Sequence, residues 1–276
     1  PTRVAASDLC YSFSLTGLLG LLWVLKNLTF THVAFVMAAS AMFATACFGL
    51  DYLKRQFLSP LRASLQNYLA TWRDLTRWSL LGVLLTEATA NAHAYLVIFI
   101  SGAQSFALLA IGALFMRPVS LSLSALSDVE RPFMARSIAG GNMAKAECSM
   151  REFRAVSTVI CVAATLFCIA VLAWFPALVL KQNYRIADVA MVAALWSAIM
   201  VTRLIRTPAS VLLQAAGEFR PLARATYLSS AVSILLTLVL LLAFGPIFSL
   251  VGILTGDAVM TAQILRAARK WKRAHG

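Results

Sequence analysis

The sequence predicts an all-α integral membrane protein, because its composition is apolar and its apolar residues form long, continuous runs. Hydrophobic residues make up 61% of the 276 residues and charged residues only 13%, whereas a typical soluble domain has about 45–50% apolar and about 25% charged residues. The runs are about 20 residues long, which is the length of a helix that crosses a hydrocarbon core about 30 Å thick. Helices also pair their own backbone groups, as a lipid environment requires.

We expect about eight transmembrane helices, with both termini in the cytoplasm. Lys and Arg gather in the N-terminal segment, in alternate connections and in the C-terminal tail, which together hold 18 of them, whereas the remaining connections hold 3. Because positive residues stay on the cytoplasmic side of a membrane, this alternation indicates an even number of spans. The expected spans are residues 9–25, 28–50, 78–101, 105–126, 155–180, 187–216, 221–245 and 246–266.

The long connection 51–77 divides the chain into unequal parts. Its apolar residues are spaced three and four apart, which predicts an amphipathic helix at the inner membrane surface; a soluble connector helix is the alternative. We therefore expect residues 1–50 to be the last two spans of an incomplete N-terminal bundle and residues 78–276 to be a six-helix bundle with a basic tail. The apolar residues of the connection are Leu58, Leu61, Leu65, Leu69 and Trp72.

The net charge of +13 does not indicate a nucleic-acid partner, because the basic residues are topology signals between apolar runs. The sequence has no phosphate-binding Gly-rich loop and no HExxH, GxSxG or CxxC motif, so we expect neither an enzyme nor a cofactor. The five cysteines have no metal-ligand spacing and lie mostly in apolar runs, where cysteine packs as a small apolar residue. A mixed-charge cytoplasmic loop is expected at 127–154.

The predicted span 78–101 carries several polar residues, which are costly in lipid and usually face a cavity or a partner. At 100° per residue, Glu87 and Asn91 share one face of the helix, whereas Thr86, Thr89 and His93 share another. This pattern predicts that the helix lines a hydrated cavity, with Asn91 as a substrate-binding candidate; hydrogen bonds between helices are the alternative. Glu87 and His93 are candidates for proton coupling, because either could change its charge near neutral pH.

The predicted span 187–216 carries Arg203 and Arg206 three residues apart, with Pro208 just beyond, where we expect a kink. Two arginines at this depth need anions, such as Glu87, Asp257 or an anionic substrate. Arginine suits phosphate because its planar guanidinium donates two parallel hydrogen bonds. Alternatively, the long side chains reach the inner interface.

Two further charged residues are predicted inside spans. The dipeptide Arg117–Pro118 interrupts the run 105–126, which predicts a kinked helix with a charge at depth. Asp257 lies in the middle of the last span, so it is a candidate either for an ion pair with an arginine or for coupling.

The order of these features resembles the second half of the polysaccharide-transport proteins in the multidrug/oligosaccharidyl-lipid/polysaccharide exporter superfamily. The resemblance covers about residues 70–270, with residues 1–50 fitting the last two spans of the first half. It rests on the segments TWRDLTRWSLLGVLL, ISGAQSFALLAIG, RPVSLSLSALSDVERP, LKQNYRIADVAMVAAL and FGPIFSLVGILTG. Its most specific segment is LLQAAGEFRPLARATYLSS, which is similar to the family pattern LxAxGxxxxxxxxxxL.

The resemblance implies a MATE-like flippase fold of two six-helix bundles around a central cavity. It implies a multi-pass protein of the bacterial inner membrane that flips a polyprenyl-pyrophosphate-linked oligosaccharide for exopolysaccharide, O-antigen or capsule synthesis. Arg117, Arg203 and Arg206 are the positions that would meet the pyrophosphate. The implied partners are the lipid-linked oligosaccharide, membrane lipid, and the proteins of polysaccharide polymerisation and export. Family members often have an Asp-Arg pair where this sequence has His93 and Ala94, so a shared coupling mechanism does not follow.

Two other functions are compatible with a helical membrane protein. A MATE-type drug or cation antiporter would need acidic cavity residues, whereas buried cations outnumber buried acids here. A membrane glycosyltransferase, or an accessory subunit of polysaccharide assembly, is the other alternative. Such a transferase would need a long outer loop with catalytic residues, and the predicted outer loops are short.

Overall fold

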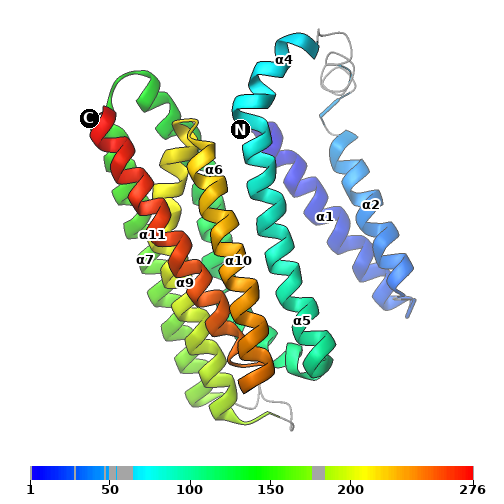
Figure 1. Ribbon diagram of the computed structural model, residues 1–276. Coiled ribbons are helices and arrows are strands. Elements are labelled where there is room, and N and C mark those ends of the chain that lie inside the picture. Colours follow the sequence, from blue (N-terminus) through cyan, green and yellow to red (C-terminus); the bar gives the residue numbers. More distant parts are fainter. Residues whose placement is uncertain are drawn as a thin grey trace. The chain divides into compact units, whose positions relative to one another are not determined.

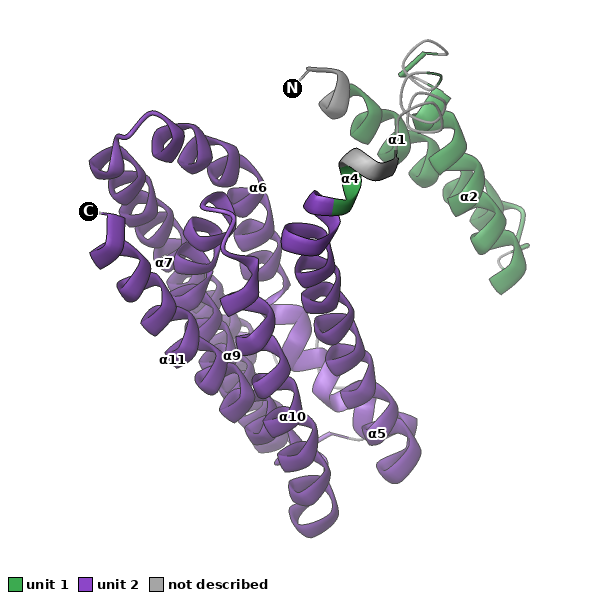
Figure 2. Cartoon of the chain, turned by 45° about the horizontal axis from the view of Figure 1, so that its top comes forward, with its two compact units in different colours: residues 1–69 green, residues 70–276 purple. Residues whose placement is uncertain are grey.

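The computed structural model describes residues 2–27, 29–46, 48–49, 54, 65–175 and 184–275, and all regular secondary structure in these residues is helical. The chain divides into two compact units, residues 1–69 and 70–276 (Figure 2). The boundary between them falls inside the connection 51–77. Leu58 and Leu61, on which the predicted amphipathic helix depends, lie outside the described residues.

The first unit contains two apolar helices, α1 (Thr2–Val24) and α2 (Phe30–Ala46). They correspond to the predicted spans 9–25 and 28–50. The Ser7 hydroxyl donates to the carbonyl of Ala44 at 3.1 Å, which ties the two helices together. α2 has only 17 residues, fewer than the roughly 20 that usually cross a bilayer.

A long helical run, whose first residues belong to the first unit, leads into the second unit. Helix α4 (Leu65–Thr71) continues through a π-helical segment, Trp72–Thr76, into α5 (Arg77–Phe115). The helix does not break at residues 77 and 78, where the predicted connection ends and the predicted span 78–101 begins. No proline or glycine lies between Leu65 and Leu81 to interrupt it, and a π-helical turn accommodates its wider geometry within a continuous helix.

Gly102 interrupts α5 with non-helical angles, φ 82° and ψ 165°. The predicted spans 78–101 and 105–126 meet at this point, and Figure 1 shows the ribbon turning sharply at the end of α5. Glycine is required because these angles are rarely open to a residue with a Cβ atom.

Gly102→Ala is therefore expected to lower the free energy of unfolding by about 1–3 kcal/mol, through strain at backbone angles that are nearly exclusive to glycine. Thermal unfolding of the purified protein in detergent measures this loss. The control is Gly20→Ala, since Gly20 lies inside α1 with open space around it. Equal stability of the two variants would contradict the strained conformation.

The next two helices replace the cytoplasmic loop expected at 127–154, so that prediction is wrong. Helix α6 spans Arg117–Ala139 and α7 spans Met143–Trp174, and only a tight turn at 140–142 separates them. Gly141 adopts φ 70°, and the Asn142 side chain accepts a hydrogen bond from the backbone N–H of Lys145 at 3.0 Å. The segment has the low hydropathy of a loop. However, Gly141 lies just beyond the end of α6, and the Asn142 side chain caps the start of α7.

The interruption predicted at Arg117–Pro118 is confirmed, because α5 ends at Phe115 and α6 begins at Arg117. Pro118 occupies the first turn of α6, where its missing N–H costs no helical hydrogen bond.

The last three helices agree closely with the predicted spans 187–216, 221–245 and 246–266. They are α9 (Ile186–Ala215), α10 (Phe219–Phe244) and α11 (Ser249–His275). α9 continues through Pro208, so the expected kink does not end the helix. α11 extends beyond its predicted span because the basic tail remains helical.

Six helices in the described part of the chain are long and apolar enough to cross a membrane, which makes the chain a multi-pass membrane protein. The predicted number of spans, eight, exceeds the six candidate spans of the described structure for two reasons. α2 is too short for this count, and the predicted spans 78–101 and 105–126 share the continuous run Tyr68–Phe115. The rest of the second of these spans belongs to α6, which is more polar.

Helices α10 and α11 approach each other closely through small residues. Gly252 and Gly256 of α11 face Thr237 and Ser233 of α10 so closely that no Cβ atom would fit between them. The Ser229 hydroxyl donates to the carbonyl of Gly256 at 2.8 Å. Small residues and interhelical hydrogen bonds are the main forces that join membrane helices, and here they fix α11 on the bundle that positions the candidate site.

Candidate functional site

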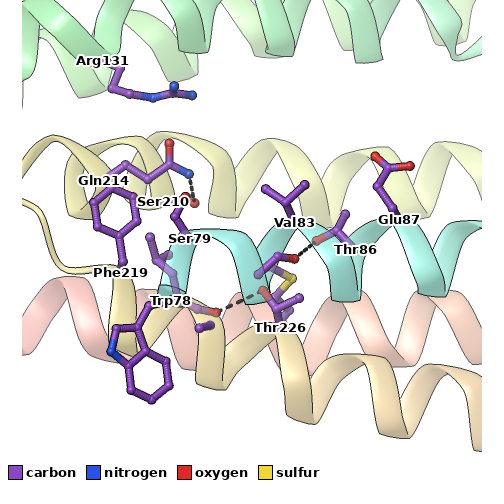
Figure 3. Close-up of a pocket in the computed structure, with 14 residues that line it drawn as sticks. Trp78, Ser79, Val83, Thr86, Glu87, Arg131, Ser210, Gln214, Phe219 and Thr226 are labelled. Atoms are coloured by element: carbon purple, nitrogen blue, oxygen red, sulfur yellow. Dashed lines mark hydrogen bonds between the residues drawn. The ribbon is translucent and has the colours of Figure 1, made fainter. Parts of the chain in front are cut away.

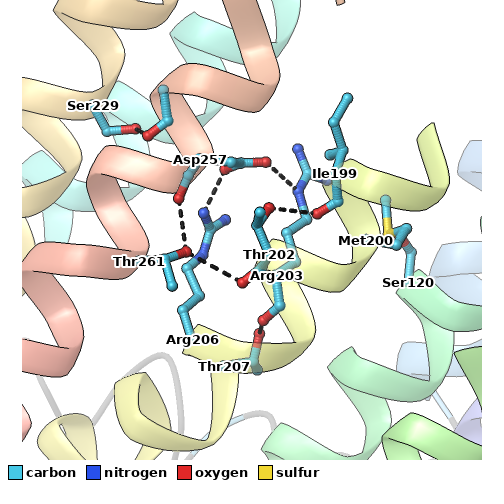
Figure 4. Close-up of polar contacts among 11 residues, drawn as sticks. Ser120, Ile199, Met200, Thr202, Arg203, Arg206, Thr207, Ser229, Asp257 and Thr261 are labelled. Carbon is cyan, nitrogen blue, oxygen red and sulfur yellow. Dashed lines mark hydrogen bonds and ion pairs between the residues drawn. The ribbon is translucent and has the colours of Figure 1, made fainter. Parts of the chain in front are cut away.

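Helices α9 and α11 bring two arginines and one aspartate together inside the second unit (Figure 4). The Nε atom of Arg203 lies 2.8 Å from Oδ2 of Asp257, and Nη1 of Arg206 contacts Oδ1 of the same carboxylate. Each carboxylate oxygen therefore receives a charge-assisted hydrogen bond from a different arginine. The predicted ion pair of Asp257 is in fact shared by both arginines. We call these three residues the arginine–aspartate cluster.

The local sequence explains this geometry. Residues three apart in a helix lie on the same face, so Arg203 and Arg206 point together towards α11. Asp257 directly follows Gly256, where α11 packs tightly on α10. A second link between the helices lies one turn beyond, where the Thr261 hydroxyl is 3.2 Å from the carbonyl of Thr202. Close packing of α11 on α10 and a hydrogen bond between α11 and α9 thus hold the cluster in place.

The cluster carries a net positive charge beside an open cavity. Two guanidinium groups share one carboxylate, and no other carboxylate in the described residues pairs with either of them. The side chain of Asp257 is 9% exposed and that of Arg206 is 15% exposed, whereas that of Arg203 is 33% exposed. Arg203 is therefore the most exposed member of the cluster, and all three residues line a cavity of about 330 Å³.

The cavity is walled by hydroxyl-bearing residues as well as by the cluster. α5 contributes Thr86, Thr89 and His93, the three residues whose spacing predicted a common face. Hydroxyls of α10 complete the wall. They belong to Thr226, Ser229, Ser230 and Ser233.

Some of these polar groups also form hydrogen bonds between helices, which is the alternative role given for the polar residues of the span 78–101. The Thr89 hydroxyl donates to Ser230 Oγ at 2.7 Å, and His93 Nε2 lies 3.1 Å from Ser249 Oγ. The same face of α5 thus lines the cavity and holds α10 and α11.

Three predicted site residues lie away from the cluster. Glu87 and Asn91 are exposed, and the Asn91 amide donates to the backbone carbonyl of Glu87 at 2.8 Å. Arg117 is exposed at the start of α6 and lines neither this cavity nor the next. The resemblance groups Arg117 with the other two arginines, but α6 places it elsewhere.

A second cavity, of about 450 Å³, adjoins the first. It lies among α5, α6, α9 and α10, and Thr86, Thr226 and Met260 line both cavities. Glu87 lines it, together with residues that the sequence analysis did not select as candidates. They are Trp78, Ser79, Arg131, Ser210 and Gln214. The spacing of Ser210 and Gln214, four apart in an apolar span, is the signal that could have identified part of this set.

Comparison with known proteins adds no assignment: no family model, curated protein or solved structure matches this chain.

The chemistry available at the site is binding and electrostatic stabilisation of an anion. The described residues contain no group of three or more His, Cys, Asp or Glu side chains that could hold a metal ion. Two partly neutralised guanidinium groups can each donate further hydrogen bonds to an oxyanion in the cavity. In surroundings of low dielectric such contacts are stronger than in water.

Proposed function

We propose that this chain forms part of a transporter that flips a polyprenyl-pyrophosphate-linked oligosaccharide across the bacterial inner membrane for polysaccharide synthesis. The observation that carries the proposal is the arginine–aspartate cluster, because two membrane-helix arginines share one carboxylate beside a cavity. The order and spacing of the sequence features favour the same substrate class. The distribution of Lys and Arg supports a cytoplasmic position for both termini in this proposal.

The physical requirement of such a reaction fits the cluster. Moving a diphosphate through lipid without compensation would leave its charges without solvation, at a very high cost. A cavity that contains guanidinium groups replaces water as the partner of the phosphate oxygens. Asp257 neutralises one of the two positive charges of the cluster. The anionic ligand neutralises the remaining charge.

The overall process would combine this site with a change of access. The isoprenoid tail would remain in lipid while the diphosphate and the glycan cross through the cavity. Rocking of helical bundles about a fixed site would then open it to each side in turn, as in other membrane transporters. A drug or cation antiporter is disfavoured, because the cluster repels cations.

The substitution Arg203→Gln is expected to slow flipping by about tenfold or more, since a hydrogen bond to a charged group contributes about 1.5–3 kcal/mol. The full chain is reconstituted in liposomes with lipid-linked oligosaccharide extracted from cells that carry the gene. Flipping is measured as the glycan fraction that becomes accessible to a membrane-impermeant glycosidase.

The matched control is Arg154→Gln, which removes an exposed arginine of α7 that lines neither cavity. It should flip the lipid at the wild-type rate. Transport of cationic dyes in place of this lipid, or flipping by Arg203→Gln at the wild-type rate, would refute the proposed function.

A further inference from the structure

The second cavity is not accounted for by the cluster, although the two cavities share part of their walls. Thr86, Thr226 and Met260 belong to the walls of both. The second cavity therefore lies next to the first inside the same helical unit, where the neighbouring part of a ligand held by the arginines would lie. The larger volume, about 450 Å³, is within the range of small-molecule binding sites.

Several polar groups on the second cavity lack good partners. The carboxylate of Glu87 makes no hydrogen bond or ion pair with any described residue, and the indole N–H of Trp78 is buried without a partner in the described structure. Gln214 has one long contact, with its Nε2 atom 3.5 Å from Ser210 Oγ. The Trp78 indole is buried, and an unsatisfied buried polar group is unfavourable among membrane helices. Together with the exposed Glu87 carboxylate and the weakly bonded Gln214 amide, it leaves the cavity with hydrogen-bonding capacity for a polar ligand.

The signs of the charges indicate what kind of ligand this is. Figure 3 shows Glu87 towards one end of the cavity, with Arg131 and Gln214 towards the other. Arg131 is only loosely paired, since its Nη2 lies 3.8 Å from Asp128 Oδ1. One carboxylate and one guanidinium balance each other, so the cavity favours neither a diphosphate nor a simple cation. It offers acceptors and donors together with hydroxyls, which suits a neutral ligand that has many hydroxyl groups.

We infer that the second cavity binds the sugar residues next to the diphosphate, while the arginine–aspartate cluster binds the diphosphate itself. This inference rests on the proposed function. Gln214 is the residue that recognises the sugar, because its amide can both donate hydrogen bonds to hydroxyl groups and accept hydrogen bonds from them. Glu87 accepts hydrogen bonds from sugar hydroxyls at the other end of the cavity. A site built to bond hydroxyl groups rejects ligands that lack them, so the second cavity provides selectivity for the glycan.

The test compares two ligands on the same protein. Binding to the full chain in lipid nanodiscs is measured for polyprenyl pyrophosphate without sugar and for the extracted lipid-linked oligosaccharide. Gln214→Leu is expected to weaken binding of the oligosaccharide lipid by about tenfold and to change binding of bare polyprenyl pyrophosphate by less than about twofold. Glu87→Gln should show the same selectivity, whereas Arg203→Gln should weaken both ligands.

A control substitution, Leu235→Ala, changes an α10 residue that is 65% exposed and lines neither cavity. It should bind both ligands as the wild type does. Equal weakening of both ligands by Gln214→Leu, or no effect on either, would overturn the sugar site while leaving the proposed function intact. If wild-type protein binds neither lipid, both the proposed function and the sugar site are refuted.

Discussion

Asp257→Ala is expected to lower the free energy of unfolding by about 3–5 kcal/mol, because it leaves two partly buried guanidinium groups without their buried counter-ion. The carboxylate is 9% exposed and contacts both Arg203 and Arg206. Removing one partner of a buried ion pair is much more costly than removing an exposed pair, since the remaining charge is not solvated. Thermal and denaturant unfolding in detergent, followed by circular dichroism, measures the loss.

The control is Asp128→Ala, which removes the carboxylate of an exposed pair with Arg131. Its cost should not exceed about 1 kcal/mol. A double substitution, Asp257→Leu with Arg206→Leu, separates charge from packing, because it removes a negative and a positive group together. If Asp257→Ala were as stable as Asp128→Ala, the cluster would not be a buried ion pair.

Gly252→Ala is expected to destabilise the fold by about 1–3 kcal/mol or more, through overpacking between α10 and α11. A Cβ atom at Gly252 would lie 2.7 Å from the Cα atom of Thr237 and closer still to its backbone nitrogen. Because these atoms are backbone, the contact can be relieved only by moving one helix away from the other. Asp257 would move with α11, so the variant should also lose binding of pyrophosphate lipids.

The matched control is Gly82→Ala, since Gly82 lies inside α5 with nothing within 4 Å of its added Cβ. Alanine is preferred to glycine in a helix interior by about 0.5–1 kcal/mol, so this variant should be as stable as the wild type or slightly more stable. The two variants are compared by the temperature of unfolding in detergent. Tolerance of alanine at Gly252 would contradict the close approach of the two helices.

Much of the fold follows from local sequence. The continuous apolar runs of α9 and α10 were predicted to within two residues at each end, because each run ends at a polar or Gly-containing turn. The errors lie where helices leave the apolar region. The segment 127–154 is polar and yet helical on both sides of a turn at Gly141, and the connection continues as a helix into α5. Hydropathy indicates whether a segment lies in lipid or in water, but it does not indicate where a helix ends. A helix can extend beyond the lipid into water.

The sequence by itself determined that the chain is helical, that it lies in a membrane, and that Arg203, Arg206 and Asp257 need partners. These conclusions depend on composition and on spacing within one helix. Only the tertiary structure decided that one carboxylate serves both arginines, that Arg117 and Asn91 lie apart from them, and that Gln214 lines an adjoining cavity. The ion pairs of Asp257 join residues that are more than 50 positions apart in the sequence. They depend on how closely α10 and α11 pack at Gly252 and Gly256, which no periodicity along one helix can specify.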